Sequence, residues 1–452
     1  MDIKNKNILI VGLGKTGIAL AKFLHKRGAK VTATDISKIE DIGEQVKPLK
    51  DLGVKLEIGQ HITESFINAD IILISPGVPH LIPPIREAMN KGVTIMGEIE
   101  FAYRFINEPI IAITGTNGKT TVTTLIAEIL KNAGKKVFLG GNIGNPLINY
   151  VDSGEKADVI IAEISSFQLD TISTFRPKVG VLLNITDDHL DRYKNFNEYV
   201  LSKGRIFENQ LEDDYAILKG DDSNIRLISE NIRSKKIFFS LESNYVSAKE
   251  FSFERIRIEM EPDIDCVIRL KNRKIIGIHN IENMIAASMA TLCLGIGVGY
   301  ISKTLNDFKG LSHRIEYVDT VKGIQYYDDS KGTNIDAVYK AVDAFESKVV
   351  IIMGGIYKGG EFDSLKEIIG KKVKAIVAIG EAKDKIKSSL SSYVQVEIAK
   401  TMDEAVNTAT TLAEHNGVVL LSPGCSSFDM FKSYVHRGEI FCKAVKKIKD
   451  AE

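Results

Sequence analysis

Short apolar runs alternate with stretches of helical periodicity along most of the chain. Near the amino terminus, residues 7–11, 30–34 and 70–75 have the pattern of buried strands, and residues 16–27 repeat apolar positions at helical spacing. Strands that alternate with helices in this way form parallel sheets covered by helices. The pattern therefore predicts a first doubly wound α/β unit that ends near Gly97.

A second α/β unit is predicted to begin with the strand 110–114 and to continue with strands at 159–163 and 179–184. Between about residues 209 and 278 the pattern changes to strict alternation, as in FERIRIEM and CVIRLKNRKIIGI. Alternation of this kind is typical of antiparallel strands with one buried face. We expect such strands to be appended to the parallel core, and a helix at 283–294 to close the unit.

A third unit is predicted to begin near His313 and to end with a helix at about 427–449. Its strands are expected at 324–328, 349–353, 375–379 and 418–422. The length of 452 residues also exceeds one ordinary hydrophobic core. We therefore expect an α/β fold of three domains: a Rossmann-like domain at 1–97, a central P-loop ATPase-type parallel sheet with appended antiparallel strands at 98–311, and a Rossmann-like domain at 312–452.

The composition narrows the class of protein further. Hydrophobic residues make up 44% of the chain and charged residues 26%, as in ordinary globular proteins. The 59 basic residues balance the 59 acidic ones, so there is no electrostatic reason to expect a nucleic-acid or membrane partner. No apolar run is long enough to span a bilayer, the start of the chain has no signal-peptide layout, and the four cysteines form no CxxC pair. We expect a reduced, cytoplasmic enzyme, and a monomer.

The first predicted strand leads directly into a GxGxxG motif at residues 12–17, and Asp35 ends the next predicted strand. Such a turn lets backbone N–H groups and a helix amino terminus approach a diphosphate, while the carboxylate can accept hydrogen bonds from a ribose. The motif does not identify the nucleotide, so a nicotinamide-dependent oxidoreductase stays possible. The glycines could also serve only close packing of strand and helix.

The second unit carries a sharper phosphate-binding motif, TGTNGKTT at residues 114–121, between a strand and a helix. Glycines let the backbone wrap phosphates, Lys119 offers a charge to the β- and γ-phosphates, and Thr120 offers a hydroxyl to Mg²⁺. Ile113 stands where the common GxxxxGK[ST] form has its first glycine, so this loop is a shortened variant. The motif predicts ATP binding.

Polar residues also follow the next strands of this unit, in GGNIG at 140–144, EISSFQ at 163–168 and NITDDHLD at 184–191. Ligands of parallel α/β proteins bind at this carboxyl edge of the sheet. Glu163 could hold Mg²⁺ there, or it could be a capping or surface carboxylate. The carboxylates around His189 could serve metal or phosphate chemistry, or form a solvated acidic turn.

These motifs together resemble the Mur ligase family. GTNGKTT (115–121), GGNIG (140–144), EISSFQL (163–169) and NITDDHLDRY (184–193) are similar to its central domain. The resemblance is extended by HNIENM (279–284), SHRIE (312–316), DDSKGTN (328–334) and LSPGCSSFDMF (421–431). It covers essentially the whole chain, and GLGKTG with SPGV at 75–78 resembles the members that add D-glutamate.

The resemblance implies an ATP-dependent amide ligase of peptidoglycan precursor synthesis. ATP phosphorylates the carboxylate of UDP-N-acetylmuramoyl-L-alanine, and the amine of D-glutamate attacks the acyl phosphate, releasing ADP and phosphate. The protein then mainly positions three reactants and neutralises phosphate charge, with ATP and Mg²⁺ required. It implies the catalytic residues Lys119, Glu163, His189, Lys203 and Lys331, and the metal ligands Thr120, Glu163, His189 and a carbamylated Lys203.

The resemblance also assigns three sets of binding residues. It implies that ATP contacts Gly115, Thr116, Asn117, Gly118, Lys119, Thr120, Thr121, Asn280, Asn283, Arg314 and Asp329. It implies that the UDP-linked substrate contacts Gly14, Lys15, Thr16, Asp35, Ser75, Gly77, Asn142, Ser165 and His189. It implies that D-glutamate contacts Thr333, Lys358, Ser427 and Phe428.

Several interpretations compete with these assignments. Without the resemblance, Lys203 would be interpreted as an ordinary solvated lysine and Lys358 as a solvated lysine in a loop. Asn280 is well suited to cap a helix. Ile356 stands where some relatives place an acidic residue, which bears on one contact near D-glutamate. Another amide ligase of the superfamily, such as the L-alanine- or diaminopimelate-adding ligase or folylpolyglutamate synthetase, remains an alternative, and so does a nucleotide-binding module without catalysis.

Overall fold

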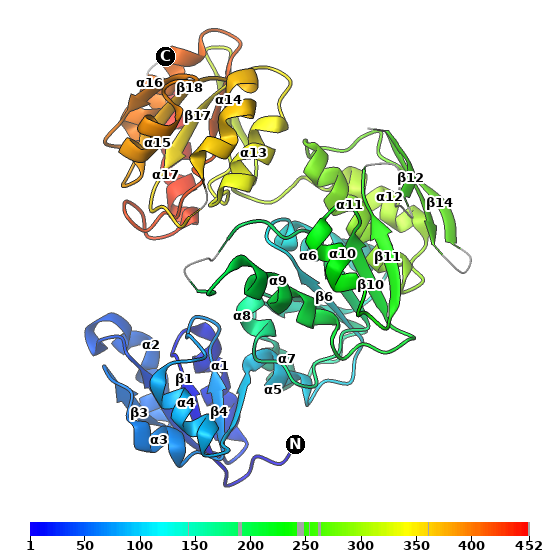
Figure 1. The fold of residues 1–452 in the computed structure, drawn as a ribbon, viewed down its shortest axis with the longest axis vertical. Helices are drawn as coiled ribbons and strands as arrows, with labels where there is room; N and C mark the ends of the chain where they lie inside the picture. Colours follow the sequence, from blue (N-terminus) through cyan, green and yellow to red (C-terminus); the bar gives the residue numbers. More distant parts are fainter. Residues whose placement is uncertain are drawn as a thin grey trace.

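The computed structural model describes residues 1–142, 144–188, 192–241, 248–252, 254–260, 264–359 and 361–450. The chain forms three α/β bodies that follow one another in sequence, with the central body between the other two (Figure 1). The amino terminus lies in the first body at one end, and the carboxyl terminus lies in the third body at the other end.

The first body is a five-stranded parallel sheet in the order β3-β2-β1-β4-β5. The strand order reverses beside β1, so the carboxyl ends of β1 and β4 border a crevice in which parallel sheets bind ligands. The strands are β1 (Asn7–Val11), β2 (Lys30–Asp35), β3 (Lys55–Ile58), β4 (Ile71–Ile74) and β5 (Thr94–Gly97), and the helices are α1 (Lys15–Lys26), α2 (Ile39–Asp51), α3 (Thr63–Ile67) and α4 (Pro83–Asn90).

The central body contains a six-stranded parallel sheet in the order β11-β10-β9-β6-β8-β7. All residues of β6, β8 and β9 are buried, as expected for strands with helices on both faces. The strands are β6 (Ile110–Thr114), β7 (Val137–Gly141), β8 (Val159–Glu163), β9 (Val179–Leu182), β10 (Tyr215–Lys219) and β11 (Lys235–Phe239). Its helices are α5 (Glu98–Tyr103), α6 (Lys119–Asn132), α7 (Leu147–Ser153), α8 (Ser166–Leu169), α9 (Phe196–Gly204), α10 (Ser223–Ser229), α11 (Ile278–Leu292) and α12 (Val298–Asp307), with a 3-10 turn at Arg205–Phe207.

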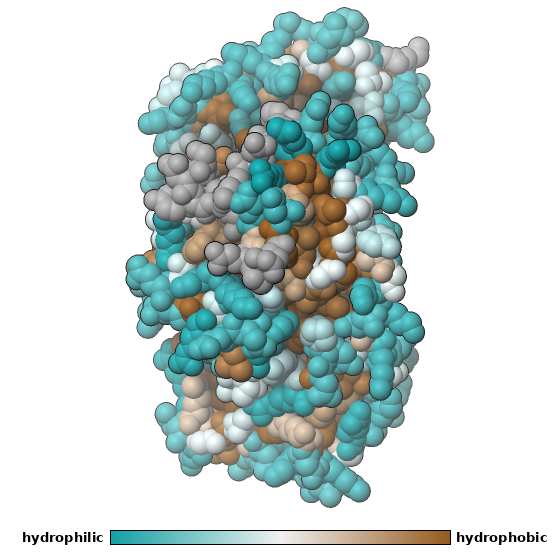
Figure 2. All heavy atoms as spheres, turned by 90° about the vertical axis from the view of Figure 1, so that its right-hand side faces the viewer, coloured by the Kyte–Doolittle hydropathy of each residue, from teal (hydrophilic) through white to brown (hydrophobic). Residues whose placement is uncertain are grey.

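The expected antiparallel strands form a separate sheet, β12 (Ala248–Ser252), β13 (Arg255–Met260) and β14 (Ile264–Arg269). The buried residues of β13 and β14 pack with α6, α11 and α12 in one core. On this side of the molecule the surface is mostly hydrophilic, apart from a hydrophobic band near the middle of the view (Figure 2). Among the described residues, no helix is both long and apolar enough to cross a bilayer.

The third body is a six-stranded sheet in the order β15-β16-β20-β17-β18-β19, in which β15 is antiparallel and the other strands are parallel. Its strands are β15 (Glu316–Val321), β16 (Ile324–Asp328), β17 (Val349–Gly354), β18 (Val373–Ile379), β19 (Gln395–Ile398) and β20 (Val418–Leu421). Its helices are α13 (Ile335–Asp343), α14 (Lys366–Lys372), α15 (Lys383–Leu390), α16 (Met402–Ala413) and α17 (Tyr434–Asp450), with a 3-10 turn at Phe362–Leu365.

Three predicted element boundaries were wrong by more than two residues. Helix α11 begins at Ile278, five residues before the predicted start, so Asn280 lies in its first turn and is not its cap. Strand β14 ends at Arg269, so the later part of the alternating stretch forms no strand. The last helix begins at Tyr434 and not near residue 427, because the Ser433 hydroxyl accepts a hydrogen bond from the His436 N–H and caps it there.

Candidate active site and substrate pockets

The phosphate-binding loop of the central body lies between β6 and α6. Gly115 and Gly118 have φ angles of 146° and 87°, a region that favours glycine. A Cβ atom at Gly118 would also collide with the side-chain oxygen of Asn283. The Lys119 ammonium donates to the carbonyl oxygens of Gly115 and Thr116, at 2.8 and 2.9 Å. Burial lowers the pKa of Lys119, and the nearby Glu163 carboxylate partly offsets this effect.

The third body contacts this loop directly. The Arg314 guanidinium donates to the Thr120 hydroxyl at 2.7 Å, and the Asn117 amide donates to the Asp336 carboxylate at 2.6 Å. Arg314 lies between His313 and Ile315, whose φ angles of 63° and 49° are unusual outside glycine. The backbone in this short segment therefore turns Arg314 towards the central body.

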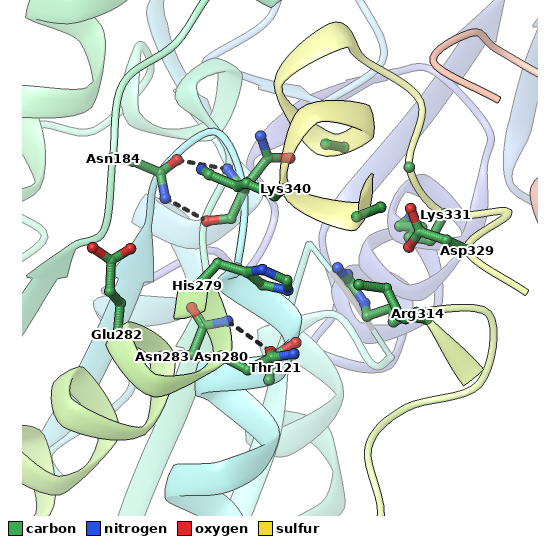
Figure 3. Close-up of a pocket in the computed structure, with 16 residues that line it drawn as sticks. Thr121, Asn184, His279, Asn280, Glu282, Asn283, Arg314, Asp329, Lys331 and Lys340 are labelled. Carbon is green, nitrogen blue, oxygen red and sulfur yellow. Dashed lines mark hydrogen bonds between the residues drawn. The ribbon is translucent and has the colours of Figure 1, made fainter. Parts of the chain in front are cut away.

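One pocket between the central and third bodies collects most of the residues predicted for ATP. Figure 3 shows Arg314, Asp329 and Lys331 on one side, away from Glu282 of α11. Of the residues predicted for ATP, the pocket is lined by Asn117, Gly118, Thr121, Asn280, Asn283, Arg314 and Asp329. The other four predicted residues belong to the phosphate-binding loop but do not line this pocket, namely Gly115, Thr116, Lys119 and Thr120.

Two charged residues of the third body are unusual in this pocket. The Asp329 carboxylate accepts a hydrogen bond from the Ser422 hydroxyl at 2.8 Å, and burial raises the pKa of Asp329 to about 7. Burial, together with the positive charge of Arg314, lowers the pKa of Lys331 to about 8. Charged residues whose pKa values are shifted in this way, such as Asp329 and Lys331, are frequent in functional sites.

The pocket also contains residues that sequence reasoning missed, namely His279, Glu282, Ala337, Lys340 and Ala341. Burial lowers the pKa of His279 to about 4, so its ring is neutral near pH 7. His279 belongs to the HNIENM motif and could have been found there. Lys340 lies outside the quoted sequence motifs, and only the packing of α13 against the central body places it in the pocket.

Glu163 lies at the end of β8 and is 2% exposed. One carboxylate oxygen accepts a hydrogen bond from the Asn142 amide at 3.1 Å. The other oxygen is buried and has no hydrogen-bond partner among the described residues. Glu163 lines neither pocket but lies near Lys119 of the phosphate-binding loop. A buried carboxylate oxygen without a partner is costly, and a cation or hydrogen-bond donor bound beside the loop would satisfy it.

Lys203 is 2% exposed, so its interpretation as a solvated lysine was wrong. Its ammonium nitrogen lies 2.9 Å from the carbonyl oxygen of Gly115 and 4.5 Å from the centre of the Tyr199 ring. Burial holds the pKa of Lys203 well below its usual value, and the charge of Lys119 lowers it further. The lysine therefore lies beside the phosphate loop with a reduced tendency to be charged.

His189, predicted as a catalytic, metal-binding and substrate-binding residue, lies outside the described residues.

A second pocket lies at the carboxyl edge of the first sheet. Of the residues predicted for the UDP-linked substrate, it brings together Gly14, Lys15, Thr16, Asp35, Ser75, Gly77 and Asn142. Asn142 comes from the central body, so the pocket spans two bodies. Both oxygens of Asp35 accept backbone hydrogen bonds, from Leu13 at 2.7 Å and Ser37 at 2.8 Å. These bonds outweigh desolvation and lower the pKa of Asp35.

Ser165 does not line this second pocket. It is the cap of α8 in a capping box with Gln168, so its hydroxyl is already used in local hydrogen bonds. The second pocket also contains the unpredicted residues His61, Ile36, Val78, Pro79 and Ile82. Val78 belongs to the SPGV motif and could have been found there, whereas the other four belong to no quoted motif and are brought to the pocket by the fold of the first body.

The residues predicted for D-glutamate lie on three neighbouring loops of the third body. Thr333 follows β16, Lys358 follows β17, and Ser427 and Phe428 follow β20. Hydrogen bonds join these loops, from Gly424 N to Gly332 O and between Ile356 and Ser426 in both directions, all at 2.9 Å. Ser427 is buried, while Lys358 and Phe428 are exposed, and none of the four lines the nucleotide pocket.

Fold and site define a class of protein with three α/β domains, a P-loop pocket closed by the last domain and a separate pocket on the first domain. Comparison with known families agrees with this class. The chain matches the MurD-like N-terminal domain of Mur ligases at residues 6–97, the Mur ligase middle domain at 113–291 and the Mur ligase glutamate ligase domain at 313–425.

Named relatives match over the full length. The chain is 46% identical to a UDP-N-acetylmuramoylalanine--D-glutamate ligase of Desulfosudis oleivorans, covering 100% of this chain and 98% of the relative. It is 45% identical to a protein of the same name from Desulfatibacillum aliphaticivorans, covering 99% and 100%. The chain belongs to the Mur ligase family.

Solved structures share the fold at low sequence identity. A pseudomurein peptide ligase type C from Methanothermus fervidus is 20% identical, with a TM-score of 0.62 and coverage of 98% of this chain and 100% of that one. A UDP-N-acetylmuramate-alanine ligase from Thermotoga maritima is 20% identical, with a TM-score of 0.58 and coverage of 98% and 99%.

Proposed function

We infer that this protein is an ATP-dependent ligase that adds D-glutamate to UDP-N-acetylmuramoyl-L-alanine in peptidoglycan precursor synthesis. The observation that carries this conclusion is the likeness, over the whole chain, to relatives of that name. The geometry supports it independently, because a phosphate-binding loop and a second pocket on another domain provide for two large substrates. We also expect a cytoplasmic monomer, and the domain limits 1–97, 98–311 and 312–452 remain our proposal.

The reaction makes a carboxylate reactive towards an amine. The γ-phosphate of ATP passes to the carboxylate of the UDP-linked substrate, giving an acyl phosphate and ADP. The amine of D-glutamate attacks the acyl carbon, loses a proton, and phosphate leaves as the amide forms. Phosphoryl transfer needs positioning and charge neutralisation more than covalent help from the protein.

Cationic side chains in the pocket and in the loop beside it suit that task. Lys119 contacts its own loop carbonyls in this structure, and it would turn to phosphate oxygens when ATP binds. We assign Arg314 and Lys331 to the same phosphates from the third domain, together with Asp329 on the nucleotide. Because two domains contribute these residues, binding of ATP should favour their closed arrangement.

The residues also fit Mg²⁺. The buried Glu163 oxygen without a partner and the Thr120 hydroxyl are hard oxygen donors near the phosphate loop. We propose that Thr120, Glu163, His189 and carbamylated Lys203 hold Mg²⁺, which neutralises phosphate charge when bound. Lys203 fits the modification because CO₂ reacts with a neutral amine, and burial favours that form.

For the binding of D-glutamate we retain Thr333, Lys358, Ser427 and Phe428, with Lys358 as a counter-charge for a carboxylate.

The test is phosphate release from ATP in the presence of UDP-N-acetylmuramoyl-L-alanine and one amino acid at a time. We expect release with D-glutamate and far less with L-alanine or diaminopimelate. Lys119→Ala should abolish release, whereas Lys135→Ala, an exposed lysine after the same helix, should not. Equal release with the other amino acids, or an active Lys119→Ala variant, would refute the proposal.

A further inference from the structure

Helix α13 of the third domain forms one wall of the nucleotide pocket, opposite the amino-terminal turns of α11 (Figure 3). Ala337, Lys340 and Ala341 line the pocket from this helix. Their spacing of three and four residues places them on one face. The alanines carry only methyl groups, so Lys340 is the long polar side chain that this face presents to the pocket.

Lys340 is held beside the phosphate-binding loop by Asp336. One oxygen of the Asp336 carboxylate accepts hydrogen bonds from the Lys340 ammonium at 2.7 Å and from the Asn117 amide at 2.6 Å. Both members of the ion pair are 23% exposed. The pair is therefore part of the domain interface and differs from an ordinary surface pair.

The start of α13 is fixed against the central domain. Asn334 caps the helix by accepting a hydrogen bond from the Ala337 N–H at 2.9 Å. The same side chain lies 3.4 Å from the side chains of Asn117 and Asp188 of the central domain. These contacts fix the direction in which Lys340 extends.

The charges at this wall suit a nucleotide. A carboxylate next to a phosphate-binding loop repels a polyphosphate unless a cation neutralises it, and the repulsion is strongest where water is excluded. Lys340 supplies that cation to Asp336. An ammonium has three N–H donors, and Asp336 is its hydrogen-bond acceptor among the described residues, so donors remain for a ligand.

We propose that Lys340 is a nucleotide-binding residue: it neutralises Asp336 beside the phosphates and donates a hydrogen bond to the nucleoside part of ATP. Asp336 is a positioning residue, which holds both Lys340 and Asn117 of the phosphate-binding loop. The inference rests on the proposed ATP-dependent function and adds a specific contact from the third domain.

Calorimetric titration with ATP and with inorganic tripolyphosphate, which lacks a nucleoside, tests both roles. Lys340→Met should weaken both ligands, because Asp336 is left with its charge. The double variant Asp336→Asn/Lys340→Met removes both charges but keeps a side-chain oxygen at residue 336 that can accept the hydrogen bond of Asn117. It should therefore bind tripolyphosphate as the wild type does while binding ATP about tenfold more weakly. Lys371→Met is the matched control, because Lys371 forms the same kind of pair with Glu367 at 2.6 Å on the exposed face of α14.

Wild-type affinity for ATP in the double variant would overturn the nucleoside contact. Equal behaviour of Lys340→Met and Lys371→Met would overturn the whole inference and leave Lys340 as a partner of Asp336 alone. A wild-type protein that binds no ATP would refute the proposed function, and this inference with it.

Discussion

The side-chain nitrogen of Lys203 lies 2.9 Å from the backbone carbonyl oxygen of Gly115, although 88 residues separate them in sequence. This contact places a buried lysine beside the first glycine of the phosphate-binding loop. Burial and the charge of Lys119 hold its pKa well below the usual value for lysine. A larger share of the Lys203 amine is therefore in the neutral form, which is the form that reacts with CO₂.

We predict that Lys203 carries a carbamate in solutions containing bicarbonate. With ¹³C-labelled bicarbonate, the wild type should give a carbamate carbon signal that Lys203→Met lacks. Lys309→Met, which changes an exposed lysine, should retain the signal. A signal of equal intensity in Lys203→Met would place the modification elsewhere.

The turn of the first domain should not tolerate a side chain at residue 17. A Cβ atom on Gly17 would collide with the carbonyl oxygen of Gly12, whose position the Ser75 hydroxyl fixes through a hydrogen bond of 2.8 Å. We expect Gly17→Ala to destabilise the protein by about 2 kcal/mol in thermal or denaturant unfolding. A Cβ atom on Gly14 meets nothing within 4 Å, so Gly14→Ala is the matched control and should leave the stability nearly unchanged.

Arg437 should be essential to the architecture of the third domain. It is 0% exposed and donates hydrogen bonds to the hydroxyl and carbonyl oxygens of Ser330 and to the carbonyls of Gly354 and Cys425. Ser330 follows β16, Gly354 is the last residue of β17, and Cys425 follows β20. Arg437→Met leaves these acceptors without donors, so we expect a loss of about 3 kcal/mol or more in the free energy of unfolding. Arg86→Met, on the exposed face of α4, should change it by less than about 0.5 kcal/mol.

Glu98 gives a prediction for the dependence of stability on pH. It is 2% exposed, accepts a hydrogen bond from the Ile148 N–H at 2.7 Å, and burial raises its pKa to about 7 from 4.5. Between these pH values the folded state holds a proton that the unfolded state releases, so stability falls as pH rises from about 4.5 to 7. The loss is at most about 3 kcal/mol.

The variant Glu98→Gln keeps a hydrogen-bond acceptor for Ile148 and cannot ionise. Unfolding measured across this pH range should therefore show a smaller decline for Glu98→Gln than for the wild type, with the largest gain above pH 7. Parallel stability curves for the two proteins would contradict the raised pKa of Glu98.

Much of the fold follows from local patterns. Strands β1, β6, β8 and β16 occupy the predicted residues, because buried parallel strands appear as uninterrupted apolar runs between loops. The four-residue strands β3, β5 and β19 were missed, because each lies at or beside an edge of its sheet, is only partly buried and contains polar residues that break the apolar run. The start of α17 was predicted too early, because one capping serine ends a loop whose composition resembles the helix that follows.

The sequence by itself determined the three α/β units, the phosphate-binding loop and the polar residues at strand ends, because each of these depends on residues close together in the chain. It also determined the family resemblance, from which most of the predicted site residues came. Only the tertiary structure decided that Lys203 is buried, that Arg314 reaches Thr120 from another domain, and that Lys340 lines the nucleotide pocket. These features depend on which surfaces meet when separate domains pack, and no local pattern of residue types encodes that meeting.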